Sequence, residues 1–257
     1  MLDDEKYFEL IKKEIFKRLG FNANDYEIKY LKRRINSRML GNGVKTYKEY
    51  LEILKHCNEE YEKLLKSLTI NVTEFFRNPE VFKAFEKKVI PELASRKGYI
   101  RIWSVGCATG EEPYSIAMLF QKNKIKNFKI YATDIDKNSL EEAMKGEYTK
   151  LPNNDMKQFF TCMNGSYKVK DEIKYRVKFA RHDVLSDKPY KNMDVIFCRN
   201  MVIYLKTEAK KKLYMDFYDL LNKSGYLVLG KTELLLGEAR DRFQVVDNVE
   251  RIYQKYN

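Results

Sequence analysis

The sequence is poor in the residues that bind metals and cross-link chains. It holds only two histidines and four cysteines, and the cysteines are widely separated, at Cys57, Cys107, Cys162 and Cys198. Because no Cys-x-x-Cys pair occurs, we expect neither a structural zinc site nor a disulfide framework, and no metal is assigned. This use of cysteine is typical of a reducing compartment and predicts a cytoplasmic protein.

Long apolar runs are also missing. No stretch approaches the ~20 residues that span a bilayer, so we do not expect a membrane protein. The first residues, MLDDEKYFELIKKEIF, are acidic and then amphipathic, unlike a signal peptide. Charged residues make up 33% and hydrophobic residues 44% of the chain, which indicates a globular protein rather than a disordered one. The net charge of +12 predicts an acidic partner: nucleic acid, an anionic membrane surface or an acidic protein.

The first 90 residues predict helices only. Apolar residues recur at helical spacing, and glycine or proline marks several helix ends. The expected helices cover about 8–19, 26–40, 46–57, 58–67 and 79–91. Thr46 and Asn58 are the expected N-caps of the third and fourth helices. In the second helix the following residues are expected to face the core: Ile28, Leu31, Ile35 and Met39.

From Tyr99 onward, short runs rich in β-formers alternate with helical segments. The runs IRIWSV, KIYATDI, DVIFCR and GYLVLG predict an α/β domain with a mostly parallel sheet and helices on both faces. The final segments, FQVVD and RIYQKY, predict an antiparallel hairpin that extends this sheet. Between Gly165 and Arg181 the alternation breaks, and the polar segments SYKVK and IKYRVKF predict a small antiparallel β insertion.

A glycine turn, Val105 to Gly110 (VGCATG), joins the first strand to a helix. Such turns let a ligand approach the backbone closely, although a purely structural strand–helix turn stays an alternative. Helix N-termini bind anions, but Glu111 and Glu112 follow this turn directly. Two carboxylates disfavour a pyrophosphate and favour a cofactor with positive charge, such as S-adenosylmethionine.

Polar residues follow the next strands at the same predicted edge of the sheet. Asp134 ends the second strand, where a carboxylate can accept hydrogen bonds from ribose hydroxyls. Asp136 is the rival, and either residue could instead cap the helix that begins near Lys137. Asp183 follows a third strand, and Arg199 with Asn200 follows the fourth. Polar groups at four strand ends predict a ligand site there.

Four segments together resemble the CheR family, the methyltransferases that modify glutamates of chemotaxis receptors with S-adenosylmethionine. They are SLTINVTEFFRNPEVF, WSVGCATGEEPYSIAM, ATDIDKNSLEEAMKGEYT and FCRNMVIYL, and they stand in family order and spacing. The likeness covers essentially the whole chain. It implies a helical N-terminal receptor-docking domain over 1–70, a linker and helix closing over the cofactor over 71–98, and a Rossmann-like methyltransferase domain over 99–257. The β insertion would occupy about 165–181.

The resemblance also implies roles for individual residues. The cofactor, whose product is S-adenosylhomocysteine, would be bound by Asn71, Thr73, Arg77, Gly106, Glu111, Asp134, Asp183, Val184, Arg199 and Asn200. An ionised glutamate is already nucleophilic, so no general base is needed. Arg199 and Tyr204 are the candidates for orienting the substrate carboxylate, and Arg77 is a second basic choice.

The partners implied by the resemblance are the cytoplasmic domains of methyl-accepting chemotaxis receptors. Acidic receptor helices would dock on the basic side chains of the second helix: Lys29, Lys32, Arg33, Arg34 and Arg38. In some relatives the insertion binds the receptor C-terminus by strand addition, helped by extra loop glycines. The link Asp171-Glu172 has none, so we do not expect that function here. We expect a monomer that does not bind nucleic acid.

Three alternatives compete with this interpretation. A nucleic-acid methyltransferase would explain the basic charge, but those acting on adenine place an Asn/Asp-Pro-Pro-aromatic run after the fourth strand, where this chain has CRNMVIY. A catalytically silent, S-adenosylmethionine-binding signalling module would keep the fold without the transfer. An NAD-type oxidoreductase is disfavoured by the doubled glutamate after the turn.

Overall fold

The chain folds into two compact units. The structure, a computed structural model, describes residues 2–96, 98–152, 154–163 and 165–256. One unit comprises Met1–Asn71 with Tyr204–Ala209, and the other Val72–Ile203 with Lys210–Asn257. The short return of the chain at 204–209 lies outside the expected boundary of the N-terminal domain.

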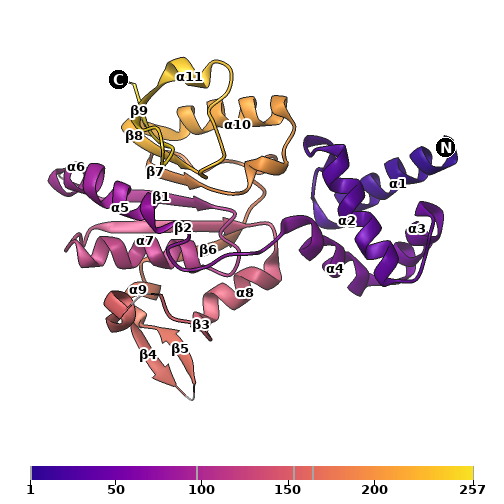
Figure 1. The fold of residues 1–257 in the computed structure, drawn as a ribbon, viewed down its shortest axis with the longest axis horizontal. Coiled ribbons are helices and arrows are strands. Elements are labelled where there is room, and N and C mark those ends of the chain that lie inside the picture. The colour runs from indigo at the N-terminus through magenta and orange to yellow at the C-terminus, as the bar shows by residue number, and fades with distance from the viewer. Residues whose placement is uncertain (1, 97, 153, 164, 257) are drawn as a thin grey trace. The chain divides into compact units, whose positions relative to one another are not determined.

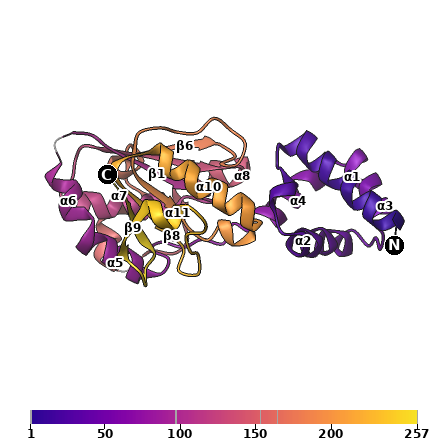
Figure 2. The same cartoon turned by 90° about the horizontal axis from the view of Figure 1, so that it is seen from above.

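The N-terminal unit is helical, as predicted (Figures 1 and 2). Its helices are α1 (Leu2–Leu19), η1 (Ala23–Asp25), α2 (Ile28–Gly41), α3 (Tyr47–His56) and α4 (Asn58–Thr69). Thr46 caps α3 in a reciprocal capping box with Glu49, as expected. Asn58 is the first residue of α4 and not its cap; that position is Cys57.

The buried face of α2 differs at one position from the one we predicted. Leu31, Ile35 and Met39 are buried, but Ile28 is 44% exposed and Tyr30 lies in the core instead. The Tyr30 hydroxyl donates a hydrogen bond to the carbonyl of Leu68. A tyrosine can be buried at the start of a helix when its hydroxyl finds such an acceptor.

The second unit contains a seven-stranded, mostly parallel sheet with strand order β6-β2-β1-β7-β8-β10-β9 (Figure 1). Its strands are β1 (Ile100–Val105), β2 (Phe128–Asp134), β6 (Val177–Arg181), β7 (Met193–Cys198), β8 (Leu221–Leu229), β9 (Phe243–Asp247) and β10 (Ile252–Lys255). The first five run parallel, and β10 and β9 add the predicted antiparallel hairpin. The predicted fold class is confirmed.

Helices cover both faces of this sheet. They are α5 (Pro79–Lys88), α6 (Ile90–Ser95), α7 (Glu111–Lys122), α8 (Lys137–Lys145), α9 (Asp171–Lys174), α10 (Thr207–Leu220) and α11 (Ala239–Arg242), with a 3₁₀ turn η3 (Val202–Tyr204). Trp103 of β1 packs edge-on against Phe217 of α10, with ring centroids 5.9 Å apart. Phe197 of β7 packs on the other face against Phe85 of α5. Within the described residues no helix is both long and apolar enough to cross a bilayer.

A separate small antiparallel sheet exists, but its strands differ from the ones we predicted. Its order is β3-β5-β4, formed by Glu147–Tyr148, Ser166–Val169 and Phe160–Met163 after a 3₁₀ turn η2 (Asn154–Phe159). SYKVK supplies the central strand. IKYRVKF does not pair with it: α9 intervenes, and the rest forms β6, which pairs parallel with β2. Both strands alternate polar and apolar residues, and alternation does not reveal the pairing partner.

Candidate active site

The glycine turn is held by the end of the neighbouring strand. Gly106 and Cys107 donate their N–H groups to the carbonyl of Thr133, at 2.8 and 3.0 Å. Gly106 has φ +68° and Gly110 φ +94°, which favour glycine. At Gly110 space is a second reason, because a Cβ would lie 2.9 Å from that of Ala143.

Asp134 fixes the same turn through its side chain. One carboxylate oxygen accepts the Ala108 N–H at 2.8 Å, and the other accepts the Asp136 N–H at 3.0 Å. Burial raises the pKa of Asp134 from its usual value. Asp136 caps α8, accepting the N–H groups of Asn138 and Ser139. Both carboxylates thus accept backbone N–H groups, and the ribose role of Asp134 stays a prediction with Asp136 as its rival.

The paired glutamates after the turn face different surroundings. Glu111 accepts the Thr109 hydroxyl at 2.7 Å, and no ion pair to it occurs among the described residues. Together with Thr73 and Tyr148 it lines a hollow of about 240 Å³, and burial raises its pKa. Glu112 points inward, accepting the Ser104 hydroxyl at 2.8 Å and Arg199 Nη1 at 3.1 Å. The expectation that both carboxylates sit at the mouth of the turn therefore holds for Glu111 alone.

Arg199 is buried and engaged on three sides. Its side chain is 1% exposed and lies over the Phe82 ring, 5.4 Å from the ring centroid. Besides its bond to Glu112, Nη2 donates to the Arg77 carbonyl at 2.7 Å and to Asn78 Oδ1 at 3.1 Å. The structure thus brings Arg77 and Arg199 together, with Arg199 anchoring the backbone of the Arg77–Asn78 turn.

The Arg77 side chain lies nearer the surface than that of Arg199. Its Nη1 donates to the Val72 carbonyl at 2.8 Å, and the side chain is half-buried. The preceding residue, Phe76, donates its N–H to the Ser115 hydroxyl on α7 at 2.9 Å. The segment from Thr73 to Asn78 is therefore held against the rest of the second unit by backbone and side-chain contacts.

The ends of β6 and β7 supply the remaining candidates. Asp183 is 7% exposed and accepts the Leu185 N–H at 3.0 Å and the Ser186 hydroxyl at 2.9 Å. It shapes the loop that contains Val184, and burial raises its pKa. Asn200 adopts φ +60°, a left-handed conformation that asparagine tolerates.

Glu233 is a buried carboxylate that the sequence analysis missed. Its Oε2 accepts the Asn200 N–H at 3.1 Å and the Gly230 N–H at 2.6 Å. The available signal was Glu233 itself, a lone carboxylate just after the apolar strand GYLVLG, at the carboxyl end of a fifth parallel strand.

Besides the basic residues of α2, two predicted site residues belong to the N-terminal unit, Tyr204 and Asn71. The Tyr204 ring stacks on Tyr30, with centroids 4.5 Å apart, and its carbonyl accepts the Glu27 N–H at 3.0 Å. Asn71 is the last residue of the unit's first segment.

The five basic residues of α2 are not equivalent. Arg38 forms a two-bond ion pair with the buried Glu60, and Lys32 pairs with Glu5 at 3.1 Å. Arg34 stacks over the Tyr30 ring. The other two, Lys29 and Arg33, are exposed.

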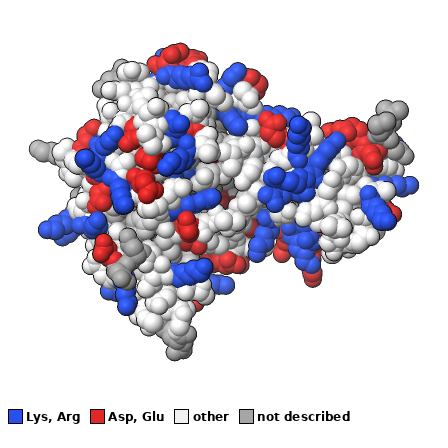
Figure 3. Space-filling view, in the orientation of Figure 1, with Lys and Arg blue, Asp and Glu red and all other residues white. Residues whose placement is uncertain are grey.

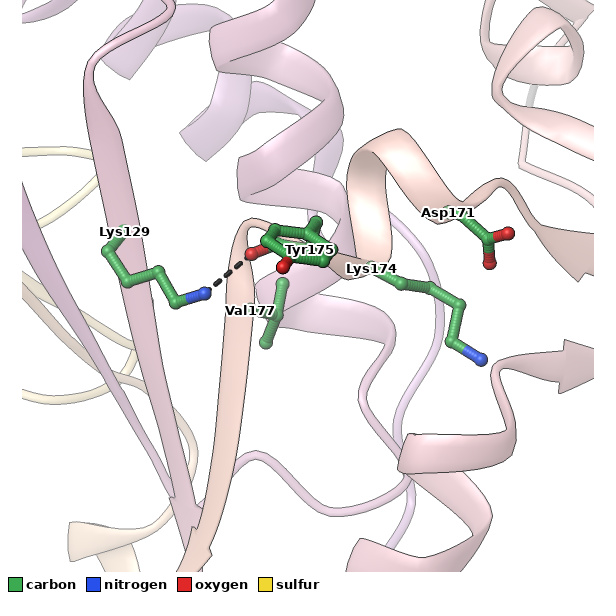
Figure 4. A pocket seen from close by; sticks show the side chains of 5 residues that line it. All are labelled: Lys129, Asp171, Lys174, Tyr175 and Val177. Atoms are coloured by element: carbon green, nitrogen blue, oxygen red, sulfur yellow. Dashed lines mark hydrogen bonds between the residues drawn. The ribbon is translucent and has the colours of Figure 1, made fainter.

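A larger hollow lies away from these residues. It measures about 560 Å³ and is lined by Lys129, Asp171, Lys174, Tyr175 and Val177 (Figure 4). Lys129 and Val177 stand at the beginnings of β2 and β6. Ligands of open α/β sheets bind at the carboxyl ends of strands, so this hollow is not part of the candidate site.

The parallel sheet, the glycine turn and the polar residues at five strand ends define a Rossmann-like α/β domain with a ligand site at the carboxyl ends of its strands. The chain matches the all-alpha domain of CheR methyltransferases over residues 6–69 and their SAM-binding domain over residues 71–252. It therefore belongs to the CheR methyltransferase family. Its cofactor is S-adenosylmethionine.

Individual relatives support this family membership. A chemotaxis protein methyltransferase of Listeria innocua is 33% identical, over 92% of this chain and 93% of that protein. One from Borreliella burgdorferi is 32% identical, over 88% and 87%. An uncharacterised 104.1 kDa protein of Rhodobacter capsulatus is 36% identical over 91% of this chain, which spans only 26% of that longer protein.

The side chains present fit this cofactor. S-adenosylmethionine carries an ammonium group and a sulfonium, and Glu111 is a half-buried carboxylate with no ion-pair partner among the described residues. A cation beside Glu111 would offset the unfavourable burial that raises the pKa of this carboxyl group.

Proposed function

We propose that this chain transfers a methyl group from S-adenosylmethionine to glutamate side chains on the cytoplasmic helices of chemotaxis receptors, giving glutamate methyl esters and S-adenosylhomocysteine for sensory adaptation. The names of the Listeria and Borreliella relatives support a chemotaxis substrate. The observation that supports a carboxylate acceptor is that His182, the histidine at these strand ends, offers no accessible ring nitrogen: Nε2 contacts a carbonyl, and Nδ1 is buried without a partner among the described residues.

The chain has two histidines, and neither is placed as a catalytic base. His56 is exposed on α3 of the N-terminal unit. His182 contacts the Lys188 carbonyl through Nε2 at 3.1 Å and packs edge-on against Trp103. A hydroxyl or amine acceptor would have to lose a proton, whereas a glutamate is ionised at neutral pH. The site therefore suits a carboxylate acceptor.

When bound, S-adenosylmethionine supplies an electrophilic methyl group: the glutamate oxygen forms a bond to its carbon, and the electron pair of the broken bond stays on sulfur. The residues of this chain bind and align the two reactants, and alignment alone can supply ~7–11 kcal/mol. We assign Glu111 to the cofactor ammonium and Asp134 to the ribose hydroxyls. Asp183-Val184 and Asn200 border the adenosine.

The contacts of Arg199 support a positioning role for this residue. Both of its terminal nitrogens are used, for Glu112 and for the Arg77–Asn78 turn. We therefore assign the orientation of the substrate carboxylate first to Arg77, with Thr73 on the same anchored segment. Tyr204 stays a candidate for orienting the substrate carboxylate, and Asn71 stays a candidate for binding the cofactor.

We assign receptor docking on α2 chiefly to Lys29 and Arg33. The other three basic residues stabilise the N-terminal unit through Glu60, Glu5 and Tyr30, whereas these two are exposed. Figure 3 shows Lys and Arg gathered on the displayed face of this unit. Such a surface would steer acidic receptor helices, in a manner that salt weakens.

The test is methyl transfer itself. The protein is incubated with S-adenosylmethionine labelled in the methyl group and with receptor cytoplasmic fragments. Label on the receptor that is released by mild base identifies a carboxyl methyl ester. A receptor fragment whose candidate glutamates are changed to alanine is the matched control. Cofactor binding without any transfer would instead support the silent signalling module.

A further inference from the structure

We infer that Glu233 is a positioning residue of the methyl-transfer site, which fixes the turn at Asn200 by accepting its backbone N–H. The inference rests on the proposed function, because that proposal places Asn200 beside the adenosine. Glu233 would act through Asn200 and need not touch either reactant.

The geometry links the ends of two neighbouring strands. β7 and β8 are parallel, with Cys198 beside Leu229 in the last register pair. Directly after β8 the chain turns, and the Glu233 N–H donates to the Gly230 carbonyl at 2.8 Å. The side chain folds back, so that Oε2 accepts the N–H groups of both Gly230 and Asn200. One carboxylate oxygen thus ties the end of β7 to the turn after β8.

The sequence makes room for this carboxylate. A Cβ on Gly230 would lie 2.6 Å from Glu233 Oε2 and 2.9 Å from the Asn200 nitrogen. Both distances are far below van der Waals contact, so a residue with a side chain at 230 would displace the carboxylate or the Asn200 backbone. Gly230 is required here by the close approach and not by its φ angle, which is outside the left-handed region.

Stability alone is a poor explanation for Glu233. Its side chain is nearly inaccessible, with 3% of the residue exposed, and no ion pair to it occurs in the described parts of the chain. Burying a carboxylate without an ion-pair partner is unfavourable, and burial raises the pKa of Glu233 although the N–H bonds and nearby Arg199 oppose this. Carboxylates kept in such surroundings at a strand end are candidates for a functional role.

The test compares Glu233→Ala and Glu233→Gln with a matched control at the opposite end of the same strands. Asp194, at the start of β7, also accepts a backbone N–H, that of Arg101 at 2.8 Å, together with the Asn222 side chain at 3.0 Å. Asp194 also pairs with Arg96 at 3.7 Å. Asp194→Ala therefore removes a carboxylate that accepts a backbone N–H at the other end of these strands, away from the strand ends that form the site. The readouts are the Kd of S-adenosylhomocysteine by calorimetry, the KM for S-adenosylmethionine and the thermal midpoint.

We expect Glu233→Ala to weaken S-adenosylhomocysteine binding by at least about tenfold and to raise KM similarly, since a hydrogen bond to a charged group is worth a factor of about ten or more. Glu233→Gln keeps a carbonyl oxygen for both N–H groups and should bind within about threefold of the wild type. Asp194→Ala should lower the thermal midpoint while leaving Kd unchanged.

Two results would overturn the inference. One is wild-type affinity in Glu233→Ala; the other is a Glu233→Gln variant as weak as Glu233→Ala, which would make the charge and not the hydrogen-bond geometry important. If Glu233→Ala does not fold, Gly230→Ala replaces it, because the added Cβ displaces the carboxylate and should weaken binding comparably. Binding of S-adenosylhomocysteine requires no receptor, so failure of the receptor assay would leave this test intact.

Discussion

Arg199 offers the sharpest test of how the site is assembled. Arg199→Met keeps much of the side chain's apolar volume and its contact with Phe82, but removes the guanidinium. Glu112 then loses its cationic partner, and the Arg77–Asn78 turn loses both hydrogen bonds from Nη2. The change should therefore affect both the stability of the methyltransferase unit and the placement of Arg77.

The expected loss follows from the burial of the pair. The Arg199 side chain is 1% exposed and that of Glu112 14%. Removing one partner of such a pair leaves an uncompensated charge and costs about 3–5 kcal/mol. At about 2–4 °C per kcal/mol for a domain of this size, the thermal midpoint should fall by roughly 6–20 °C.

Thermal unfolding and S-adenosylhomocysteine calorimetry together test whether Arg199 acts by positioning its neighbours. The double variant Arg199→Met/Glu112→Gln should recover part of the loss, because no charge is left unpaired. Arg242→Met is the control: it breaks a surface pair with Glu238 at 2.7 Å, which should cost less than ~1 kcal/mol. A stable Arg199→Met protein with abolished methyl transfer would refute the positioning role and restore Arg199 as a substrate contact.

Three further predictions address the proposed ligand contacts. Asp134→Ala should weaken S-adenosylmethionine binding at least about tenfold by calorimetry, since two hydrogen bonds to a charged acceptor are lost. Glu111→Gln should weaken cofactor binding yet raise the thermal midpoint of the ligand-free protein near neutral pH. Burial raises the pKa of Glu111, so its ionisation opposes folding as pH rises through that pKa, and the amide avoids this. Lys29→Glu with Arg33→Glu should slow receptor methylation at low salt, with a smaller effect at high salt and no change in cofactor affinity.

Each of these three predictions would be contradicted by a specific result. Unchanged affinity in a folded Asp134→Ala protein would remove the ribose assignment. A less stable Glu111→Gln protein would mean that this carboxylate supports the fold. For docking, the control is Lys13→Glu with Lys17→Glu, the same charge change on exposed positions of α1; equal slowing by both double variants would indicate general electrostatics instead of an α2 surface.

The strand ends were predictable because parallel strands bring polar residues to one edge whatever the details of packing. Asp134 and Asn200 follow from that rule alone. The rule does not say which carboxylate faces the ligand: Glu111 and Glu112 are adjacent in sequence, and only the positions of Ser104 and Arg199 decide that Glu112 turns inward. These partners come from other elements, so no local pattern reveals them.

The sequence also did not determine which strands pair with each other. SYKVK and IKYRVKF carry the same alternation, yet one forms the small sheet and the other the edge of the large one. Similarly, Ile28 fits the helical period of α2 but is its first residue and is 44% exposed, whereas Tyr30 lies off that period and is buried with its hydroxyl bonded to the Leu68 carbonyl. Tertiary hydrogen bonds outweigh periodicity at such positions.

The last prediction concerns the small sheet. We still expect it not to bind the receptor C-terminus, but the structure gives different reasons for this expectation. The sheet's one lysine, Lys168, lies in the central strand and not at an edge, and pairs with Glu147. The hairpin loop between β4 and β5 is short and contains a single glycine, Gly165; its other residue, at position 164, lies outside the described residues.

An added peptide strand would pair with the four-residue edge strand β4 or with the two-residue β3. About half of the backbone groups of a strand face outward, so β4 offers at most about four hydrogen bonds. At ~0.5–1.5 kcal/mol net each, these give about 2–6 kcal/mol, before the peptide's ordering entropy is subtracted. Low-micromolar affinity requires about −8 kcal/mol. We therefore expect no measurable binding of a receptor C-terminal peptide in calorimetry at micromolar concentrations, and equal methylation of receptors with and without that tail. Micromolar binding would show that side-chain pockets beside β4 contribute what its backbone cannot.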